Sequence, residues 1–548
     1  MSTPDVTVVV AVYNTMPYLT ETLNSLVKQS IGRDRLEIVA VDDGSTDGSG
    51  AELDKFAARY PDTVKVIHQA NSGGPAAPSN RALELATGRF VYFIGADDYL
   101  GKEALERMVA CADEHGSDIV VGRMVGTNGR YAHQALFQKN DPDISLYDSA
   151  LPFTMANIKL FRRELLERHE IRYPEHLRVG SDQPFTLEAC VNAKKISVLA
   201  DYEYYYAVKR VNSSNITYSS NHLSRLHCTA EIMKFAAGLI EAGPKRDWVL
   251  RRHFIWELWK LVQDDFLALD EDVQQEVCKG IGELADLYFT DGVRDSMDVR
   301  RRVRIGLCRA GALEELRETI RSEAEFGAPP LVLEDGRAYV SYPGFRDGPG
   351  LPDRLYEVLE PEPRMVADNV RFVSASWEQE ADEITFVLAV KVGVSGGTGS
   401  PVVRLMEGQL PKSTLSPGGR RLSDGHELPS LVGEFKAAPD DEGVLLHARI
   451  PVERRKAKLA VRVYVDVAGS TYEIPLKTRG LPLPLARRWR HDHPHRVSAN
   501  ANHRGQLIVT TAPLWEPVPG IGERLLTQVY QRQWLRRRLA RLKRKVTR

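Results

Sequence analysis

The sequence predicts an α/β domain with a mainly parallel, Rossmann-like sheet, followed by an α-helical connector and a C-terminal antiparallel β-sandwich. Three observations predict this order. Short apolar runs alternate with amphipathic segments over residues 1–125, which is typical of a sheet covered by helices. Helical spacing dominates residues 222–325. Alternating strand patterns separated by Gly, Pro, Asp and Ser begin near residue 331.

The composition is that of a soluble globular protein. The 548 residues predict about two to four domains, and the formal net charge of −1 gives no sign of a nucleic-acid partner. No apolar run approaches the ~18 residues that span a bilayer, and the N-terminus lacks a signal-peptide pattern, so we expect a cytoplasmic protein. The five cysteines are widely spaced without a CxxC pair. They predict buried free thiols.

In the first domain, residues 1–221, polar loops follow the predicted strands. Strands are expected at 6–12, 36–41, 64–68, 90–94 and 119–121, and helices at 18–29, 50–59, 80–86 and 103–115. The loops that follow the first four strands read YN, DDGSTD, NSGGP and GADD. Ligands of such sheets bind beyond the carboxyl ends of the strands. No glycine-rich turn follows the first strand, which disfavours a dinucleotide-dependent hydride transfer.

Asp97 and Asp98 end the predicted strand within FVYFIGADDYL, residues 90–100. Carboxylates suit a hard divalent cation, which would neutralise the charge on a departing diphosphate. The alternative is a turn in which an Asp caps the next helix. The two residues alone leave both interpretations open.

Together, VTVVVAVYN, EIVAVDDGSTDGS, the segment from NSGGP to GADDYL, and VGSDQPF resemble the family 2 glycosyltransferases of GT-A fold over about 200 residues. The resemblance implies a UDP-sugar donor whose uracil contacts Tyr13 and Asp43, and whose base or ribose contacts Asn71. Ala11 and Val12 would supply backbone groups.

The same resemblance places the metal-binding D-x-D element of the family on Gly95-Ala96-Asp97. It implies that Asp97 holds Mn²⁺ or Mg²⁺ on the donor diphosphate, with Ala96 in the donor site. Asp98 would brace the loop or help to place the acceptor.

Asp182, in HLRVGSDQPF, takes the role of general base by the resemblance, with Gln183 beside it as a further candidate. A carboxylate opposite the leaving diphosphate can accept the proton of an acceptor hydroxyl in a single displacement, which inverts the anomeric configuration. From the residues alone, Asp182 fits a helix N-cap better. Arg210, with Lys209 as the alternative, would pair with the diphosphate, although a solvated turn is equally consistent with the residues.

Three positions depart from the family pattern. Gly95 replaces the first Asp of D-x-D, Ser79 replaces an Arg, and Ser181 replaces the Glu before the base. Each departure removes a charge near the donor or the base. The resemblance therefore leaves metal dependence and turnover open.

The rest of the chain is predicted as a helical connector at 222–330, a β-hairpin or linker at 331–352, the β-sandwich at 353–480 and an irregular segment at 481–520, in which GQLIVTTA is a candidate late strand. This architecture resembles the family 2 enzymes that glycosylate wall teichoic acids of the poly(ribitol phosphate) type. It implies a sandwich that forms homo-oligomers or binds the polymer.

Residues 521–548 form a basic amphipathic tail whose last 25 residues hold ten Lys and Arg and no acid. Helical spacing of its leucines suits an interfacial helix on an anionic membrane surface. A solvated tail and a polyanion-binding arm are the alternatives.

We therefore expect a metal-dependent, inverting hexosyl- or N-acetylhexosaminyltransferase that uses a UDP-sugar. The acceptor would be a hydroxyl of an anionic, teichoic acid-like glycopolymer or a lipid-linked acceptor, at the cytoplasmic face of the membrane. The alternatives are an exopolysaccharide or glycolipid transferase, and a GT-A protein that binds nucleotide-sugar or polymer without turnover.

Overall fold

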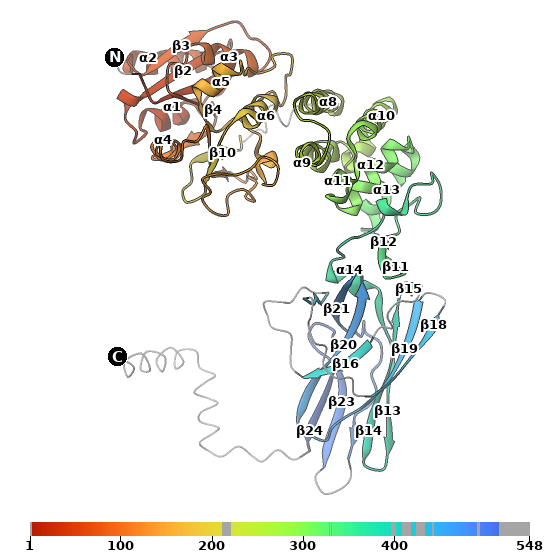
Figure 1. Cartoon of the computed structure of the whole chain (residues 1–548). Helices are drawn as coiled ribbons and strands as arrows, with labels where there is room; N and C mark the ends of the chain where they lie inside the picture. Colours follow the sequence, from red (N-terminus) through yellow and green to blue (C-terminus); the bar gives the residue numbers. More distant parts are fainter. Residues whose placement is uncertain are drawn as a thin grey trace, which may run out of the picture. The chain divides into compact units, whose positions relative to one another are not determined.

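The computed structural model describes residues 3–210, 221–327, 329, 331–395, 402–407, 418–423, 433–440, 443–489 and 494–514. The chain divides into two compact units (Figure 1). The first comprises Met1–Gly327 and Tyr342–Tyr356, and the second comprises Ala328–Ser341 and Glu357–Arg548. Over the described ranges, no helix combines the length and the apolar character needed to cross a membrane.

A seven-stranded sheet in the order β3-β2-β1-β4-β8-β6-β9 forms the centre of the first unit. Its strands are β1 (Val6–Val12), β2 (Leu36–Asp42), β3 (Val64–His68), β4 (Phe90–Gly95), β6 (Ile119–Gly122), β8 (Leu160–Arg162) and β9 (Ile196–Leu199). All neighbours pair in parallel except β8, which runs antiparallel to β4 and β6. The predicted mainly parallel sheet is confirmed. The sequence does not predict β8, because three residues are too few to show a strand period.

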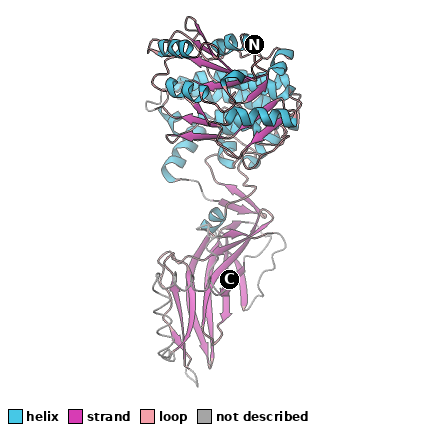
Figure 2. Ribbon diagram, turned by 90° about the vertical axis from the view of Figure 1, so that its left-hand side faces the viewer, coloured by secondary structure: helices cyan, strands magenta, loops and turns pink. Residues whose placement is uncertain are grey.

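Helices pack against this sheet, as Figure 2 shows for the first unit. Every residue of β2 is buried, which explains the apolar run expected of a parallel strand covered on both faces. The helices of the α/β part are α1 (Leu19–Val27), η1 (Arg33–Arg35), α2 (Ser49–Arg59), α3 (Ala76–Glu84), α4 (Ala104–His115), η2 (Leu151–Thr154), α5 (Arg163–Arg168) and α6 (Asp182–Asn192).

The strand register brings the ends of four strands to one edge of the sheet. Val12 pairs with Asp42, and Asp42 pairs with His68. On the other side of β1, Ala11 pairs with Gly95. The polar loops that follow β1, β2, β3 and β4 therefore start side by side.

A small second sheet supports the turn after β4. It consists of β5 (Tyr99–Leu100), β10 (Tyr205–Val208) and β7 (Met124–Thr127), in the order β5-β10-β7. The Tyr99 and Tyr206 rings stack with their centroids 4.6 Å apart. This pairing holds the turn Gly95–Asp98, called the acidic turn below, next to the end of β10. From there the chain continues to Arg210.

The predicted helical connector at 222–330 is confirmed as helical, but most of it is not a separate domain. Leu177 of the α/β part packs with Cys228 and Ile232 in one apolar cluster, and Trp248 Nε1 donates to the Ser149 carbonyl at 3.0 Å. These contacts make one unit of both parts. The helices are α8 (His222–Leu239), α9 (Pro244–Arg252), the π-helix η3 (His253–Leu258), η4 (Asp264–Ala268), α10 (Glu271–Tyr288), α11 (Asp291–Asp295), α12 (Val299–Arg309), α13 (Leu313–Phe326) and η5 (Asp353–Leu355).

The segment predicted as one hairpin or linker at 331–352 is divided between the units. Its hairpin, β11 (Leu331–Glu334) and β12 (Arg337–Val340), belongs to the second unit, whereas Tyr342–Tyr356 belongs to the first. The Tyr342 hydroxyl donates to Glu323 of α13 at 3.3 Å, which links Tyr342–Tyr356 to the first unit. The spacing of the sequence does not reveal this contact.

Two antiparallel sheets build most of the second unit, which confirms the predicted C-terminal β fold. Their orders are β13-β14-β19-β18 and β17-β21-β20-β24-β23-β22, with β16 also paired to β20. The elements are α14 (Pro363–Asp368), β13 (Val370–Glu380), β14 (Glu383–Val392), β15 (Val394–Ser395), β16 (Val402–Glu407), β17 (Arg420–Arg421), β18 (Glu434–Asp440), β19 (Gly443–Pro451), β20 (Ala457–Val467), β21 (Ser470–Pro475), β22 (Arg487–Arg488), β23 (His495–Ala501) and β24 (Leu507–Pro513).

The predicted irregular segment at 481–520 is wrong, because β22, β23 and β24 extend the second sheet to Pro513. The candidate strand in GQLIVTTA is β24. Strand β23 is not predicted because its residues are mostly polar. Only Val497 and Ala499 of this strand are buried. The predicted tail at 521–548 lies outside the described residues. All five cysteines are free and buried, as predicted.

Candidate functional site

The loops after β2 and β3 hold each other through Asp43. Its carboxylate accepts hydrogen bonds from the Gln69 amide at 2.6 Å and from the Ser72 N–H and hydroxyl at 3.1 and 2.9 Å. The Asn71 amide donates to the Asp43 carbonyl at 3.0 Å and accepts from the Gly73 N–H at 3.0 Å. Asp43 and Asn71 therefore lie at the expected edge, where their side chains shape the loops.

The loop after β1 presents an aromatic ring to solvent at the same edge. Tyr13 is 48% exposed, so its ring can stack on a base. It follows Ala11 and Val12, the last two residues of β1. Asn14 has a positive φ of 48° and accepts a hydrogen bond from the Thr46 N–H at 2.8 Å, which ties this loop to the loop after β2.

Asp97 and Arg210, expected to bind the metal and the diphosphate, bind each other. Arg210 Nε donates to Asp97 Oδ2 at 2.6 Å, and their side chains are only 16% and 11% exposed. The Arg210 guanidinium also lies 6.0 Å from the centre of the Tyr18 ring. The alternative Lys209 uses its carbonyl to accept from Asn128 at 3.4 Å.

Asp98 braces the acidic turn from within. It is 5% exposed and accepts hydrogen bonds from the Val208 N–H at 2.6 Å and from the Tyr205 hydroxyl. Arg130 Nη1 lies 3.4 Å from Oδ1 of the same carboxylate. Burial, with the nearby charge of Asp97, raises the pKa of Asp98 to about 6. Sequence reasoning missed Arg130 and the Tyr205 contact, because their positions depend on the small second sheet.

Gly95 has a steric reason to be a glycine. A Cβ atom there would lie 2.9 Å from Asp98 Oδ2 and 3.1 Å from Asp97 Oδ1. The Gly95 N–H also donates to the Tyr205 hydroxyl at 3.2 Å. The next residue, Ala96, is buried, and its carbonyl accepts from the Thr22 hydroxyl at 3.0 Å. A side chain at position 95 would therefore crowd both carboxylates in this conformation.

Asp97 is the carboxylate of this turn that fits a divalent cation. Asp98 is already engaged by three donors, whereas Asp97 is paired with the cation Arg210 at 2.6 Å, so its carboxylate already faces a positive charge. In the part of the chain that the structure describes, no group of three or more His, Cys, Asp or Glu residues could hold a metal ion. Mg²⁺ commonly binds one or two carboxylates together with substrate phosphates, so the residues fit a cation that arrives with the donor.

Asp182 is the first residue of α6. The N-cap position belongs to Ser181, whose side chain makes no capping hydrogen bond, so the alternative N-cap role of Asp182 is not observed. Burial raises the pKa of Asp182, while the cations Arg252 and Lys159 lower it. A raised pKa makes a carboxylate a stronger proton acceptor.

Two cations near Asp182 were missed by sequence reasoning. Gln183 accepts a hydrogen bond from Arg252 Nη1 at 2.7 Å. The Lys159 ammonium is buried, donates to the Ala156 carbonyl at 2.5 Å and to the Thr154 carbonyl. Burial lowers the pKa of Lys159 to about 8. Neither cation carries a sequence signal, since only the packing of distant segments brings it to α6.

The segment before α6 lies beside the loop after β3. A Cβ atom on Gly74 would be 3.7 Å from the Arg178 backbone, and the Asn80 amide donates to the Tyr173 carbonyl at 2.9 Å. The proposed base-binding edge and the Asp182 segment are therefore brought together. The departures Ser79 and Ser181 are both buried, in α3 and immediately before α6.

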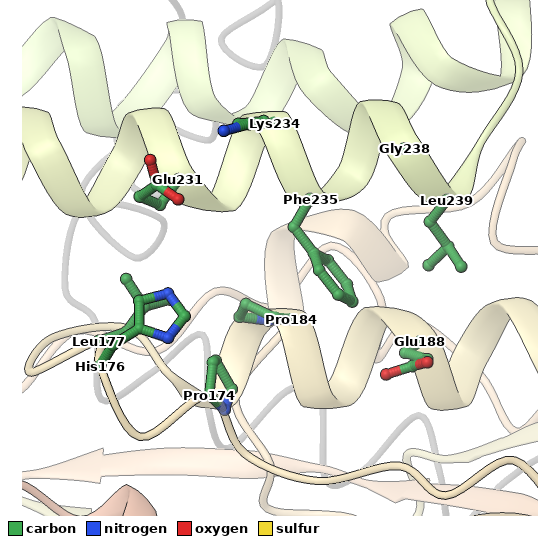
Figure 3. Close-up of a pocket in the computed structure, with 10 residues that line it drawn as sticks. All are labelled: Pro174, His176, Leu177, Pro184, Glu188, Glu231, Lys234, Phe235, Gly238 and Leu239. Atoms are coloured by element: carbon green, nitrogen blue, oxygen red, sulfur yellow. The ribbon is translucent and has the colours of Figure 1, made fainter.

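A cavity of about 430 Å³ lies between α6 and α8 (Figure 3). Phe235 projects from α8 towards α6, where Pro184 and Glu188 line the opposite wall. Pro184 is two residues after Asp182, and positions two apart point to different sides of a helix. The cavity therefore lies on another side of α6 from the candidate base.

Two family profiles match the first unit. The family described as "Glycosyl transferase family 2" matches residues 7–170, and "Glycosyl transferase TarS linker domain" matches residues 228–320. The second match covers most of the helical segment that packs on the α/β part.

Two curated relatives extend these matches. The poly(ribitol-phosphate) β-glucosyltransferase of Bacillus spizizenii is 42% identical over 205 residues, which is 37% of this chain and 32% of the relative. The poly(ribitol-phosphate) β-N-acetylglucosaminyltransferase TarS of Staphylococcus aureus is 42% identical over 203 residues, 37% of this chain and 35% of the relative. The matched part thus spans about a third of these curated relatives.

A solved structure matches more of the chain. The crystal structure of S. aureus TarS residues 1–349 in complex with UDP-GlcNAc is 30% identical, with a TM-score of 0.55. The match covers 64% of this chain and 98% of that one. From the sheet, the strand-end loops and these matches, we conclude that the chain belongs to the family 2 glycosyltransferases and carries a TarS-type linker domain.

Proposed function

We propose that the chain is an inverting glycosyltransferase that moves a sugar from a UDP-sugar to a hydroxyl of a poly(ribitol phosphate)-type envelope polymer. Two relatives are named as poly(ribitol-phosphate) transferases, one for glucose and one for N-acetylglucosamine, and a solved relative contains UDP-GlcNAc. The observation that carries the proposal is the Asp182 carboxylate at the start of α6, in a segment that lies beside the loop after β3.

In this proposal the strand-end loops bind the donor. Tyr13 would stack on the uracil, since its ring is exposed at the edge. Arg210 would leave Asp97 and pair with the diphosphate, whose oxygens match a guanidinium well. A divalent cation bound at Asp97 would supply positive charge that stabilises the departing diphosphate.

Asp182 would act as the general base. Its carboxylate removes the proton of the acceptor hydroxyl as that oxygen forms a bond to the anomeric carbon, and the bond from this carbon to the UDP oxygen breaks. Attack opposite the leaving group inverts the configuration. General-base catalysis contributes about 10²- to 10⁴-fold to a rate, so Asp182→Asn should lower turnover by that factor.

The experiment measures UDP release and polymer glycosylation with UDP-GlcNAc or UDP-glucose, Mn²⁺ or Mg²⁺, and poly(ribitol phosphate). Wild type should turn over one donor, Asp182→Asn should lose turnover but keep thermal stabilisation by UDP, and Glu188→Gln is the matched control. Glu188 lies on the same helix and lines the cavity of Figure 3. Donor binding without turnover by wild type would instead favour a binding protein.

The proposal includes two further partners. The basic tail at 521–548 would hold the enzyme at an anionic membrane surface, and the C-terminal β unit would form a homo-oligomer. Sedimentation with anionic and with neutral lipid vesicles tests the tail, and light scattering tests the oligomer. Equal sedimentation with both vesicle types, or a monomeric mass, would contradict the respective part.

A further inference from the structure

One buried arginine joins the helical segment to the first turn of α6. Arg252, the last residue of α9, is 8% exposed. Its Nη1 donates to Gln183 Oε1 at 2.7 Å, and its Nη2 lies 3.1 Å from Glu257 Oε1. Gln183 directly follows the candidate base, Asp182. Gln183 and Glu257 therefore hold the guanidinium from two sides, close in sequence to the candidate base Asp182.

The backbone after α9 explains how Arg252 and Glu257 meet. Residues His253–Leu258 form the π-helix η3, whose hydrogen bonds link residues five apart. This wider turn brings the side chains of residues 252 and 257 closer to one face than an α-helix would. The Arg252 guanidinium also lies 5.5 Å from the Trp256 ring.

Trp256 in turn anchors η3 to the α/β part. Its ring packs edge-on against Phe153 at 5.0 Å and against His133 at 5.2 Å. The position of Arg252 relative to α6 is therefore set by aromatic packing as well as by the bond to Gln183.

We propose that Arg252 is a positioning residue for the general base, so that the linker domain completes the active site. Arg252 fixes the first turn of α6 through Gln183, and its positive charge favours the carboxylate form of Asp182. The inference rests on the proposed function, since it takes Asp182 as the base.

The charges around Asp182 predict opposite changes in its pKa for two substitutions. Burial raises the pKa of Asp182, Arg252 and Lys159 lower it, and Glu257 raises it. Tyr173 also lies within electrostatic range and is neutral, because burial raises its own pKa well above the usual value. Removal of the Arg252 charge should therefore raise the pKa of Asp182, whereas removal of the Glu257 charge should lower it.

The test compares pH profiles of kcat/KM for UDP release with UDP-GlcNAc and UDP-glucose as probes. Because Asp182 must be ionised to act as a base, Arg252→Met should move the acidic limb upward by about one pH unit, the lower end of the shift that an opposite charge causes. Glu257→Gln should move the limb downward, and Arg252→Lys should restore most of the wild-type profile.

Arg251→Met is the matched control. It removes the same charge from the same helix, but Arg251 packs over Trp248 and Phe153, so the limb should stay in place. An activity loss in Arg252→Met that is equal at every pH, with the limb unmoved, would indicate a merely structural role and overturn the inference.

A second measurement does not need turnover. The Tm difference produced by Asp182→Asn, followed against pH, reports the titration of Asp182 through its linkage to stability. The midpoint of this difference should lie higher in the Arg252→Met background than in the wild-type background, and an unmoved midpoint would overturn the inference. Lack of turnover by wild type, with the midpoint shifted as expected, would refute the proposed function alone.

Discussion

Substitution of Gly95 tests whether the acidic turn has room for a side chain. A Cβ atom there would lie 2.9 Å from Asp98 Oδ2, 3.1 Å from Asp97 Oδ1 and 3.4 Å from the Tyr205 hydroxyl. Both carboxylates would have to shift by several tenths of an ångström, and Asp98 is held by Tyr205 and the Val208 N–H. Overpacking typically costs about 1–3 kcal/mol. We expect Gly95→Ala to lower the free energy of unfolding by about that amount.

Gly95→Asp would restore the acid of the family pattern and is the sharper test. It adds a third carboxylate beside two others, so we expect it to be at least as destabilising as Gly95→Ala, with weaker Mn²⁺-dependent binding of a UDP-sugar. If the family pattern alone determined metal binding, this variant would bind Mn²⁺ more tightly than wild type.

Urea unfolding and Mn²⁺ titration calorimetry of both variants provide the assay. Gly238→Ala is the control, because a Cβ atom on Gly238, the next-to-last residue of α8, meets nothing within 4 Å and causes no clash. The control should match or exceed wild-type stability. A Gly95→Asp protein as stable as wild type, with tighter Mn²⁺ binding, would refute the steric reasoning.

Two further predictions concern charges at the same edge. Arg210→Ala should raise the affinity of the donor-free protein for Mn²⁺ in calorimetry, because the guanidinium no longer holds Asp97 at 2.6 Å; unchanged affinity would argue against Asp97 as a ligand. His68 lies 2.9 Å from Asp42 and 3.0 Å from Asp54, and these carboxylates raise the pKa of His68 above 6.5. The resulting stabilisation is present below pH 6.5 and is lost as the pH rises through the higher folded-state pKa. The Tm deficit of His68→Asn should therefore shrink from about pH 6 to pH 9, and a constant deficit would contradict this account.

Much of the site could be predicted because it follows strand ends. The runs that form β1, β2 and β4 are buried almost throughout, so their apolar character is visible in the sequence. Parallel strands present their carboxyl ends at one edge, which places Tyr13, Asp43 and Asp97 near one another without knowledge of any side-chain contact.

Other features depend on packing between distant segments. The three-residue β8 and the mostly polar β23 show too few buried positions to reveal a strand period. The union of the helical segment with the α/β part depends on contacts such as Trp248 with Ser149. Neither the composition nor the spacing of these residues indicates such a contact.

Local periodicity and residue order are enough to predict the α/β order of the first domain, the polar loops after its strands and the place of Asp97 and Asp182 in the chain. Three features are seen only in the folded chain: a side chain on Gly95 would crowd both carboxylates, Arg210 binds Asp97, and Arg252 reaches Gln183. Each of these contacts joins groups whose distance is determined by the packing of whole sheets and helices, which no single segment encodes.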